Sequence, residues 1–115
     1  MLVVETSEKD TINLYASHYY KTSYEKLKEA YLNILTENNF RIVSIDDSYS
    51  EIFAEQPHLS VQAKIIEQNP KETSIDFYIS SEFLFGNRKK INSFLTMIYA
   101  NLEKEFELKG LGLHK

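Results

Sequence analysis

The sequence predicts an α+β protein in which a single antiparallel sheet has two helices packed on one face. Two amphipathic helix patterns, near residues 22–38 and 87–108, enclose a run of strand patterns between residues 40 and 80. A short alternating pattern around residues 12–17 precedes the first helix. The expected order of elements is therefore β-α-β-β-β-β-α, and the short turns between consecutive strands favour antiparallel pairing.

Length and composition indicate one folded domain. The chain has 115 residues, enough for one hydrophobic core and too few for two. Hydrophobic residues make up 43% and charged residues 26%, a balance typical of folded globular proteins. We expect a single domain over residues 1–115, with an ordered core at about 11–108 and flexible ends.

Cysteine content and charge narrow the setting and the partners. The chain has no cysteine, which excludes disulfides and fits a reducing compartment. The start of the chain carries no signal-peptide pattern, so we expect a cytoplasmic protein without stable membrane insertion. Abundant Lys, Asn, Ile and Tyr are typical of an AT-rich bacterial genome. Residues 86–115 hold six basic and three acidic residues, hence +3, whereas the remainder carries −7. Because no strongly basic surface results, we expect no binding to nucleic acid.

The alternating segment before the first helix is expected to be a strand, with Ile12, Leu14 and Ala16 on one side. Thr22 and Glu25 then have the spacing of a capping box at the start of the first helix. The helix should end at residues 38–39, where two asparagines can adopt the left-handed conformation. Its buried stripe is expected to comprise Tyr24, Leu27, Tyr31, Ile34 and Leu35.

The central strands share one consistent register. Turns rich in Asp, Ser, Pro and Asn separate four expected strands, which lie near residues 40–45, 50–55, 59–66 and 73–80. Pairing Ile42 with Ile52, Ile52 with Ala63, and Ala63 with Phe77 places all the apolar positions on one face, and a one-residue slip would destroy this agreement. The expected inner face comprises Phe40, Ile42, Ile52, Ala54, Val61, Ala63, Ile65, Ile75, Phe77 and Ile79.

The last helix is expected to begin after residues 86–87 and to run to about residue 108. Its apolar stripe should dock on the inner face of the sheet, because six large side chains recur at helical spacing. They are Ile91, Phe94, Leu95, Ile98, Leu102 and Phe106. The residues after Gly110 and Gly112 are expected to form a flexible tail.

The histidines and the Asp-rich turn do not have the pattern of a metal site. His18 and His58 have no second ligand at zinc spacing, and we expect both in loops. Asp46 opens an Asp-rich turn, but a calcium loop would need glycine and glutamate where the chain has Glu51 and Pro57. We expect no metal and no cofactor.

One pair of carboxylates remains as candidate acid–base chemistry. Glu51 and Glu55 should point to the same sheet face, which would suit an acid–base pair. Glu51 should also face Lys64 on the neighbouring strand, and a cross-strand ion pair explains it equally well. We find no catalytic residues in this pattern and do not expect an enzyme.

The sheet face away from the helices is expected to mix aromatic, aliphatic and charged side chains. Such mixed surfaces often form protein–protein interfaces, although scattered apolar residues are also common on exposed sheets. The expected face comprises Tyr15, Arg41, Val43, Ile45, Tyr49, Glu51, Phe53, Glu55, Gln62, Lys64, Ile66, Asp76 and Tyr78. Its possible interface residues are Arg41, Val43, Ile45, Tyr49, Phe53 and Tyr78.

A second candidate surface is the loop before the last helix. Phe83 and Phe85 lie just before Gly86 and the basic triplet Arg88, Lys89 and Lys90. An aromatic loop beside basic residues could contact a membrane or a nucleic acid. The interpretation that we favour is that both phenylalanines close the end of the core beneath the helix.

The order of elements resembles the TATA-box-binding-protein-like fold. Residues 32–43, with Asp46-Asp47 and residues 51–55, also resemble several small bacterial domains of unassigned function. Asn39 and Ser50 stand where those domains usually have glycine. The resemblance covers about residues 11–107 and implies the fold alone, since the acidic strands lack the basic and intercalating residues that DNA binding requires.

These patterns together indicate a non-catalytic domain that self-associates, as a homodimer, or binds another protein through its open sheet face. The alternative is a carrier that holds a small hydrophobic ligand or lipid between sheet and helices. Ala54 and Ala63, which are small and on the inner face, would leave room for such a ligand.

Overall fold

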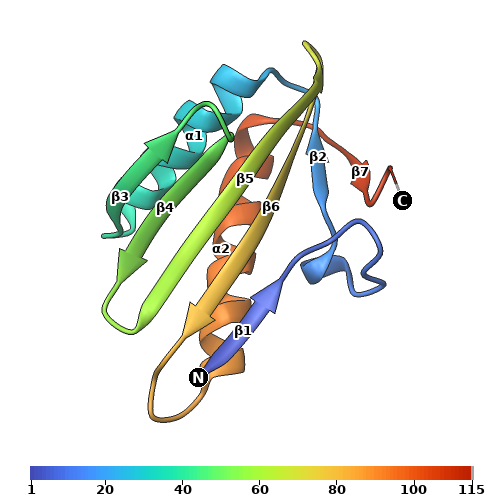
Figure 1. Ribbon diagram of the computed structural model, residues 1–115. Coiled ribbons are helices and arrows are strands. Elements are labelled where there is room, and N and C mark those ends of the chain that lie inside the picture. Colours follow the sequence, from blue (N-terminus) through green and yellow to red (C-terminus); the bar gives the residue numbers. More distant parts are fainter. Residues whose placement is uncertain (115) are drawn as a thin grey trace.

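Within residues 1–114, which the computed structural model describes, a seven-stranded antiparallel sheet forms one layer and two helices cover one of its faces (Figure 1). The helices are α1 (Tyr24–Glu37) and α2 (Asn87–Glu105), with a short 3-10 helix, η1, at Asn13–Tyr15. The strands are β1 (Leu2–Glu5), β2 (His18–Tyr20), β3 (Arg41–Asp46), β4 (Glu51–Gln56), β5 (Leu59–Asn69), β6 (Glu72–Ser81) and β7 (Leu108–Leu111).

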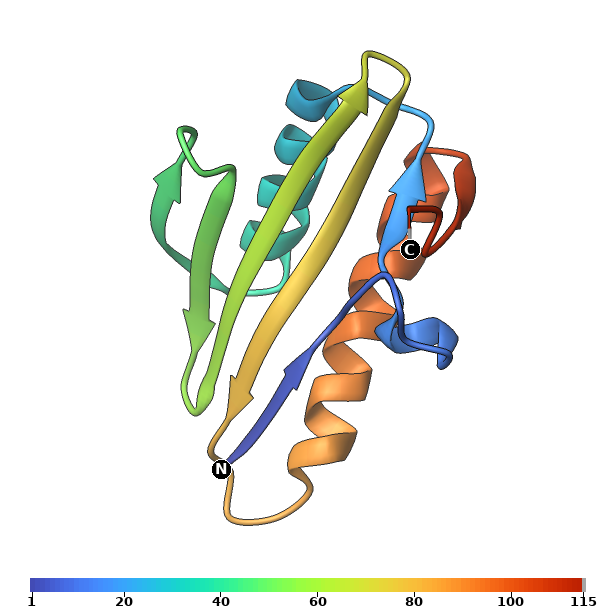
Figure 2. The same cartoon turned by 45° about the vertical axis from the view of Figure 1, so that its right-hand side comes forward.

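Strands β3 to β6 follow one another as antiparallel neighbours, and β2 and β7 continue the sheet beyond β6. Strand β1 also pairs with β6, alongside the part of β6 that β2 does not reach. Two short strands thus share one edge of β6 (Figure 2). Between them, residues 7–17 leave the sheet and return through η1.

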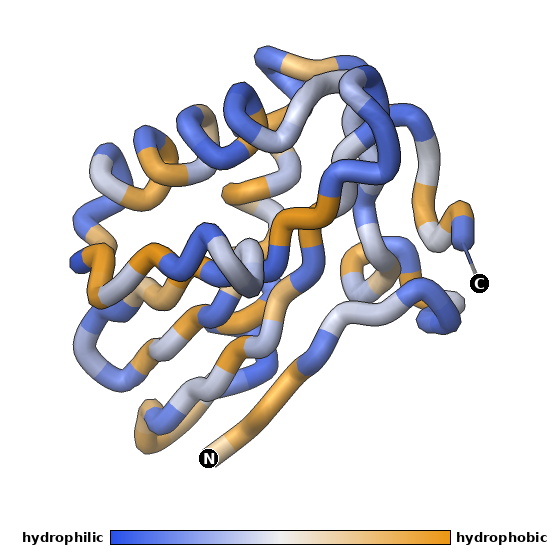
Figure 3. The backbone as a smooth tube through the Cα atoms, turned by 45° about the horizontal axis from the view of Figure 1, so that its top comes forward, coloured by the Kyte–Doolittle hydropathy of each residue, from blue (hydrophilic) through white to orange (hydrophobic). Residues whose placement is uncertain are grey.

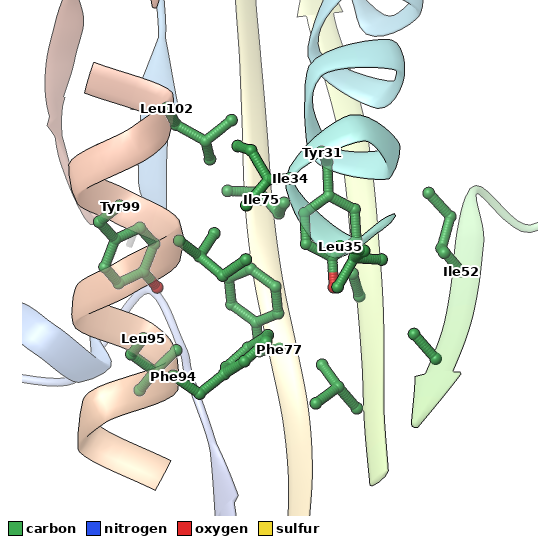
Figure 4. Close-up of a cluster of buried hydrophobic side chains, with 14 of the residues drawn as sticks. Tyr31, Ile34, Leu35, Ile52, Ile75, Phe77, Phe94, Leu95, Tyr99 and Leu102 are labelled. Atoms are coloured by element: carbon green, nitrogen blue, oxygen red, sulfur yellow. The ribbon is translucent and has the colours of Figure 1, made fainter. Parts of the chain in front are cut away.

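The core lies between the sheet and the two helices. Hydrophobic and hydrophilic residues alternate along the strands (Figure 3), which directs one set of side chains toward the helices. Tyr31 of α1 and Tyr99 of α2 both contact Phe77 of β6, with ring centroids 5.7 and 5.9 Å apart (Figure 4). Tyr99 was not part of the apolar stripe that the sequence predicts for the last helix. The stripe residues that it does predict for α1 and α2 are buried, apart from the half-buried Tyr24 and Phe106.

The central register that the sequence predicts is confirmed in the second and third hairpins. Ile52 pairs with Ala63, and Ala63 pairs with Phe77. The prediction for the first hairpin is wrong, because a bulge at residue 43 places Ile42 opposite Ala54 and Ile45 opposite Ile52. An extra residue on one strand shifts all the positions on one side of it.

The start of the chain also differs from the prediction. The alternating segment at residues 12–17 is not a strand: Ile12 is exposed and residues 13–15 form η1. The strands lie instead at residues 2–5, which we expected to be flexible, and at 18–20. Tyr15 is therefore not on the open sheet face, because η1 packs beside α2 and the Tyr15 hydroxyl is bonded to Asn92. After α2, residues 108–111 add β7, which the sequence did not indicate.

The helix boundaries follow local backbone chemistry. Ser23, one residue after the predicted Thr22, caps α1 by accepting a hydrogen bond from the Lys26 N–H. Asn39 and Ser50, which stand where glycine was expected from the resemblance, both have positive φ, 63° and 58°. These are the left-handed conformations that glycine adopts without strain and that asparagine tolerates well.

Candidate interaction surfaces

Among residues 1–114, no helix covers the face of the sheet opposite α1 and α2 (Figure 1), and we call this face the open face. Phe53 of β4 lies opposite Gln62 of β5, and Gln62 lies opposite Tyr78 of β6. Phe53 is 40% exposed and Tyr78 is 47% exposed. With the bulge residue Val43, they line a hollow of about 230 Å³. Three large apolar side chains, Val43, Phe53 and Tyr78, therefore lie across the centre of the open face, with Gln62 between the last two. We call these three side chains the apolar row.

Charged side chains of both signs surround this row. Arg41 of β3 forms an ion pair with Glu55 of β4. Glu51 lies opposite Lys64, as the sequence predicts, but its carboxylate accepts a hydrogen bond from Gln62 Nε2 at 2.7 Å. The open face thus combines an apolar centre with charged residues that already have polar neighbours on the same sheet.

The structure brings four of the six predicted interface residues together: Arg41, Val43, Phe53 and Tyr78. Ile45 is misplaced by the prediction, since the bulge turns it to the helix side, opposite the buried Ile52. Tyr49 lies in the turn between β3 and β4 and is 68% exposed, away from the apolar row. Val3 of β1, opposite Ser80, is an exposed apolar residue of this face that the sequence did not indicate.

Asp76 lies on β6 between the residues that pair with β1, which end at Tyr78, and those that pair with β2, which begin at Ile75. Its Oδ1 accepts hydrogen bonds from the hydroxyls of Thr6 and Ser17, both at 2.7 Å, so it ties the two ends of the 7–17 excursion together. Burial raises the pKa of the Asp76 carboxyl above its ordinary value, while the two hydroxyls act in the opposite direction. The sequence could not predict this structural role, because the role depends on β1 and β2 pairing with different parts of the same edge of β6.

His18 has a structural environment, contrary to its expected place in a loop. It lies in β2, is 6% exposed, and stacks on the ring of Tyr99 with centroids 3.4 Å apart. Burial lowers the pKa of its imidazole, and Nδ1 lies 2.8 Å from the carbonyl oxygen of Ala16. His58 is in the β4–β5 turn, as predicted, where its ring lies 5.6 Å from that of Phe83. Residues 1–114 contain no cluster of three His, Asp or Glu side chains that could hold a metal.

The loop between β6 and α2 divides its two phenylalanines between the core and solvent. Phe83 packs against the core, as the sequence predicts. Phe85 does not: it is 82% exposed, and its neighbour Leu84 is 87% exposed. The prediction for Phe85 is wrong. Gly86, which has φ 74°, caps the start of α2, and the two loop residues before it lie beyond the end of the core. Arg88, Lys89 and Lys90 follow Asn87 at the start of α2 and are exposed.

The space proposed for a carried ligand is occupied by side chains. Ala54 is 2% exposed and Ala63 is fully buried, and both belong to the hydrophobic cluster beneath the helices. The hollows at Arg41, Asp76, Met97 and Asn33 are open to solvent. The alternative of an internal carrier gains no support from these features.

Comparison with known proteins does not assign the chain to a family. The sequence matches no protein-family model and no curated protein. Within the described residues, neither helix is long and apolar enough to cross a membrane.

Proposed function

We propose that the protein is a non-catalytic domain that forms a homodimer through its open face. The observation that carries this proposal is the exposed apolar row of Val43, Phe53 and Tyr78 at the centre of an uncovered sheet. Apolar side chains gathered on one face, with charged residues around them, have the arrangement of an interface core and its polar rim.

The charges favour a second copy as the partner. A twofold interface brings the same patch of both copies together, so the patch has to complement itself. The open face meets this requirement in part, because Arg41 and Lys64 can meet acidic residues of the second copy, while each copy keeps a net charge of −2 from these two basic residues and its four acidic residues. These are Glu5, Glu51, Glu55 and Asp76.

The size of the apolar row sets the expected affinity. Complete burial of a large apolar side chain contributes about 1.5–3 kcal/mol. Each of the three side chains is 40–48% exposed, so burying that exposed part contributes about 1 kcal/mol per side chain. Two copies supply about 6 kcal/mol, which is comparable with the cost of about 4–15 kcal/mol for association. The apolar row alone thus leaves at most about 2 kcal/mol for association, so we expect only a weak dimer, populated at about millimolar concentrations with the help of polar contacts at the rim.

Sedimentation velocity over a concentration series tests the proposal. The double variant Phe53→Ser/Tyr78→Ser should be monomeric at concentrations where the wild type is dimeric. Tyr49→Ser is the matched control, because it removes an exposed aromatic side chain that lies off the apolar row. Circular dichroism of each variant confirms that the fold is retained.

Two outcomes would overturn the proposal. A wild-type protein that stays monomeric up to millimolar concentration does not self-associate through any surface. A dimer that persists in the double variant uses a different surface. Conversely, loss of the dimer in the double variant alone supports the open face as the interface.

A further inference from the structure

The loop between β6 and α2 presents two large apolar side chains at one end of the molecule. Leu84 is 87% exposed and Phe85 is 82% exposed, so almost nothing of this chain covers them. Figure 2 shows the loop projecting past the end of the sheet, where it joins β6 to α2. We call Leu84 and Phe85 the tip.

The loop that carries the tip is tied to the body of the protein. The Asn87 side chain accepts hydrogen bonds from the Ser81 hydroxyl at 2.7 Å and from the Phe83 N–H at 2.8 Å. Its amide group donates to the Phe83 carbonyl at 3.1 Å. Phe83 itself packs on the core, with the Lys90 ammonium 5.3 Å from its ring centroid. The residues on both sides of the tip are therefore fixed to the core, through Phe83 and the hydrogen bonds of Asn87, while the tip itself projects into solvent.

Basic residues surround the tip on the side of α2. Arg88, Lys89 and Lys90 occupy its first turn, where positive charge is unfavourable for the helix dipole. Residues 82–90 contain these three basic residues and one acidic residue, Glu82, hence a net charge of +2 in a chain of −4. Arg88 donates a hydrogen bond to the Tyr15 hydroxyl at 3.0 Å, which accounts for part of its placement within this chain. All three basic side chains are nevertheless exposed, so they can also face an external anionic partner.

The outer surface of α2 extends the same character away from the tip. Beyond Arg88 and Lys89, it carries Asn92, Ser93, Thr96, Met97 and Ala100, which are small or uncharged. The first acidic residue of the helix is Glu103, in its last turn. A flat anionic surface could therefore approach this side of the helix without meeting a carboxylate until its far end.

We propose that the tip binds the surface of a bilayer that contains anionic lipids. Leu84 and Phe85 enter the boundary between headgroups and acyl chains, and Arg88, Lys89 and Lys90 contact the lipid phosphates. A convex apolar tip suits a soft bilayer, which closes around it, whereas a folded partner would need a matching groove. Contact is peripheral, because only two side chains enter.

The energetics predict reversible binding with two separable components. Each basic residue near an anionic surface strengthens binding by about fivefold, and this component is screened by salt. Each large apolar side chain that enters the bilayer strengthens binding by about tenfold or more. Removal of the basic residues should therefore weaken binding strongly at low salt and little at high salt. Removal of the two apolar side chains of the tip should weaken binding by a similar factor at both salt concentrations.

Vesicle flotation with the whole chain tests the proposal. The wild type should bind phosphatidylcholine vesicles containing about one third phosphatidylserine, and should bind pure phosphatidylcholine vesicles much more weakly. Leu84→Ser/Phe85→Ser should lower the affinity by about a hundredfold, and Lys89→Gln/Lys90→Gln by about twenty-five-fold. Ile12→Ser is the matched control, since it removes an apolar side chain that is 56% exposed in the 7–17 excursion.

Three results would overturn the proposal. The first is no binding of the wild type to the anionic vesicles, which would leave a protein as the partner of the tip. The second is unchanged binding by the Leu84→Ser/Phe85→Ser variant, and the third is equal binding to both kinds of vesicle. The proposal does not depend on the open-face dimer, because no tip residue lies on that face.

Discussion

Removing one hydroxyl from the core, by Tyr31→Phe, should stabilise the protein. Tyr31 is fully buried on α1, and its hydroxyl has no hydrogen-bond partner among residues 1–114. Burial accordingly raises the pKa of the phenol well above its ordinary value. In the unfolded chain this hydroxyl bonds to water, so folding removes that interaction and replaces it with nothing.

The size of the effect follows from this lost hydration. An unsatisfied buried polar group costs about 1–3 kcal/mol, and phenylalanine fills nearly the same volume without leaving a cavity. Unfolding entropy of about 2.1 cal/mol/K per residue amounts to about 0.24 kcal/mol/K for 115 residues. The melting temperature of Tyr31→Phe should therefore rise by about 4–12 °C.

Tyr20→Phe is the matched control for this prediction. Tyr20 is also fully buried, but its hydroxyl donates to Glu103 Oε2 at 2.9 Å. Removing this charge-assisted hydrogen bond should destabilise the protein by about 1.5–3 kcal/mol. Urea denaturation with a constant m-value measures both changes. If Tyr31→Phe loses as much stability as Tyr20→Phe, the Tyr31 hydroxyl is satisfied in solution and the reasoning is refuted.

Two buried titratable groups should give stability opposite dependences on pH. Because burial lowers the pKa of His18 from 6.5, the unfolded chain binds more protons below about pH 6.5, so stability should fall on acidification; His18→Phe, which keeps a ring on Tyr99, should reduce that loss. Burial raises the pKa of Asp76 above 3.8, so at pH values just above 3.8 the folded protein binds more protons than the unfolded chain. The contribution of Asp76 to stability should therefore fall as the pH rises through this range. Asp76→Asn should remove that fall. Urea denaturation between pH 4 and 8 measures both, and parallel curves for wild type and variant would contradict either one.

The central part of the fold could be predicted because several independent patterns had to agree. Ile52, Ala63 and Phe77 share one face only if two hairpins have the correct register, and the structure has that register. Each helix likewise offers a stripe of several large apolar residues. Long, periodic segments contain enough positions to exclude the wrong period.

The edges of the sheet could not be predicted because their strands are too short. β1 and β7 have four residues each and β2 has three, so none can show a convincing alternation. Their pairing depends on β6 and on one another, which is tertiary information. The alternating residues 12–16, by contrast, had a strand pattern but form η1 at residues 13–15 and an isolated bridge between Ala16 and Ser7.

The candidate surfaces were predictable only to the same extent. Alternation correctly placed Phe53 and Tyr78 on the open face, but it could not reveal the bulge that moves Ile45 to the other side. The sequence also gave equal weight to Phe83 and Phe85, two residues apart in an aperiodic loop. Only the position of Gly86 and the hydrogen bonds of Asn87 separate a core residue from an exposed one.

The two proposed surfaces occupy different sides of the molecule, and their relative placement limits how they can act together. The open face is the broad side of the sheet, whereas the tip projects beyond one end of β6 (Figure 1). A dimer whose twofold axis runs parallel to the strands directs both tips toward the same plane. Both copies could then contact one bilayer, and the second contact would strengthen binding without any new side chain. An axis perpendicular to the strands within the sheet plane would direct the tips to opposite ends, so each could contact only a separate surface. The direction of the twofold axis therefore decides whether self-association and membrane contact reinforce each other.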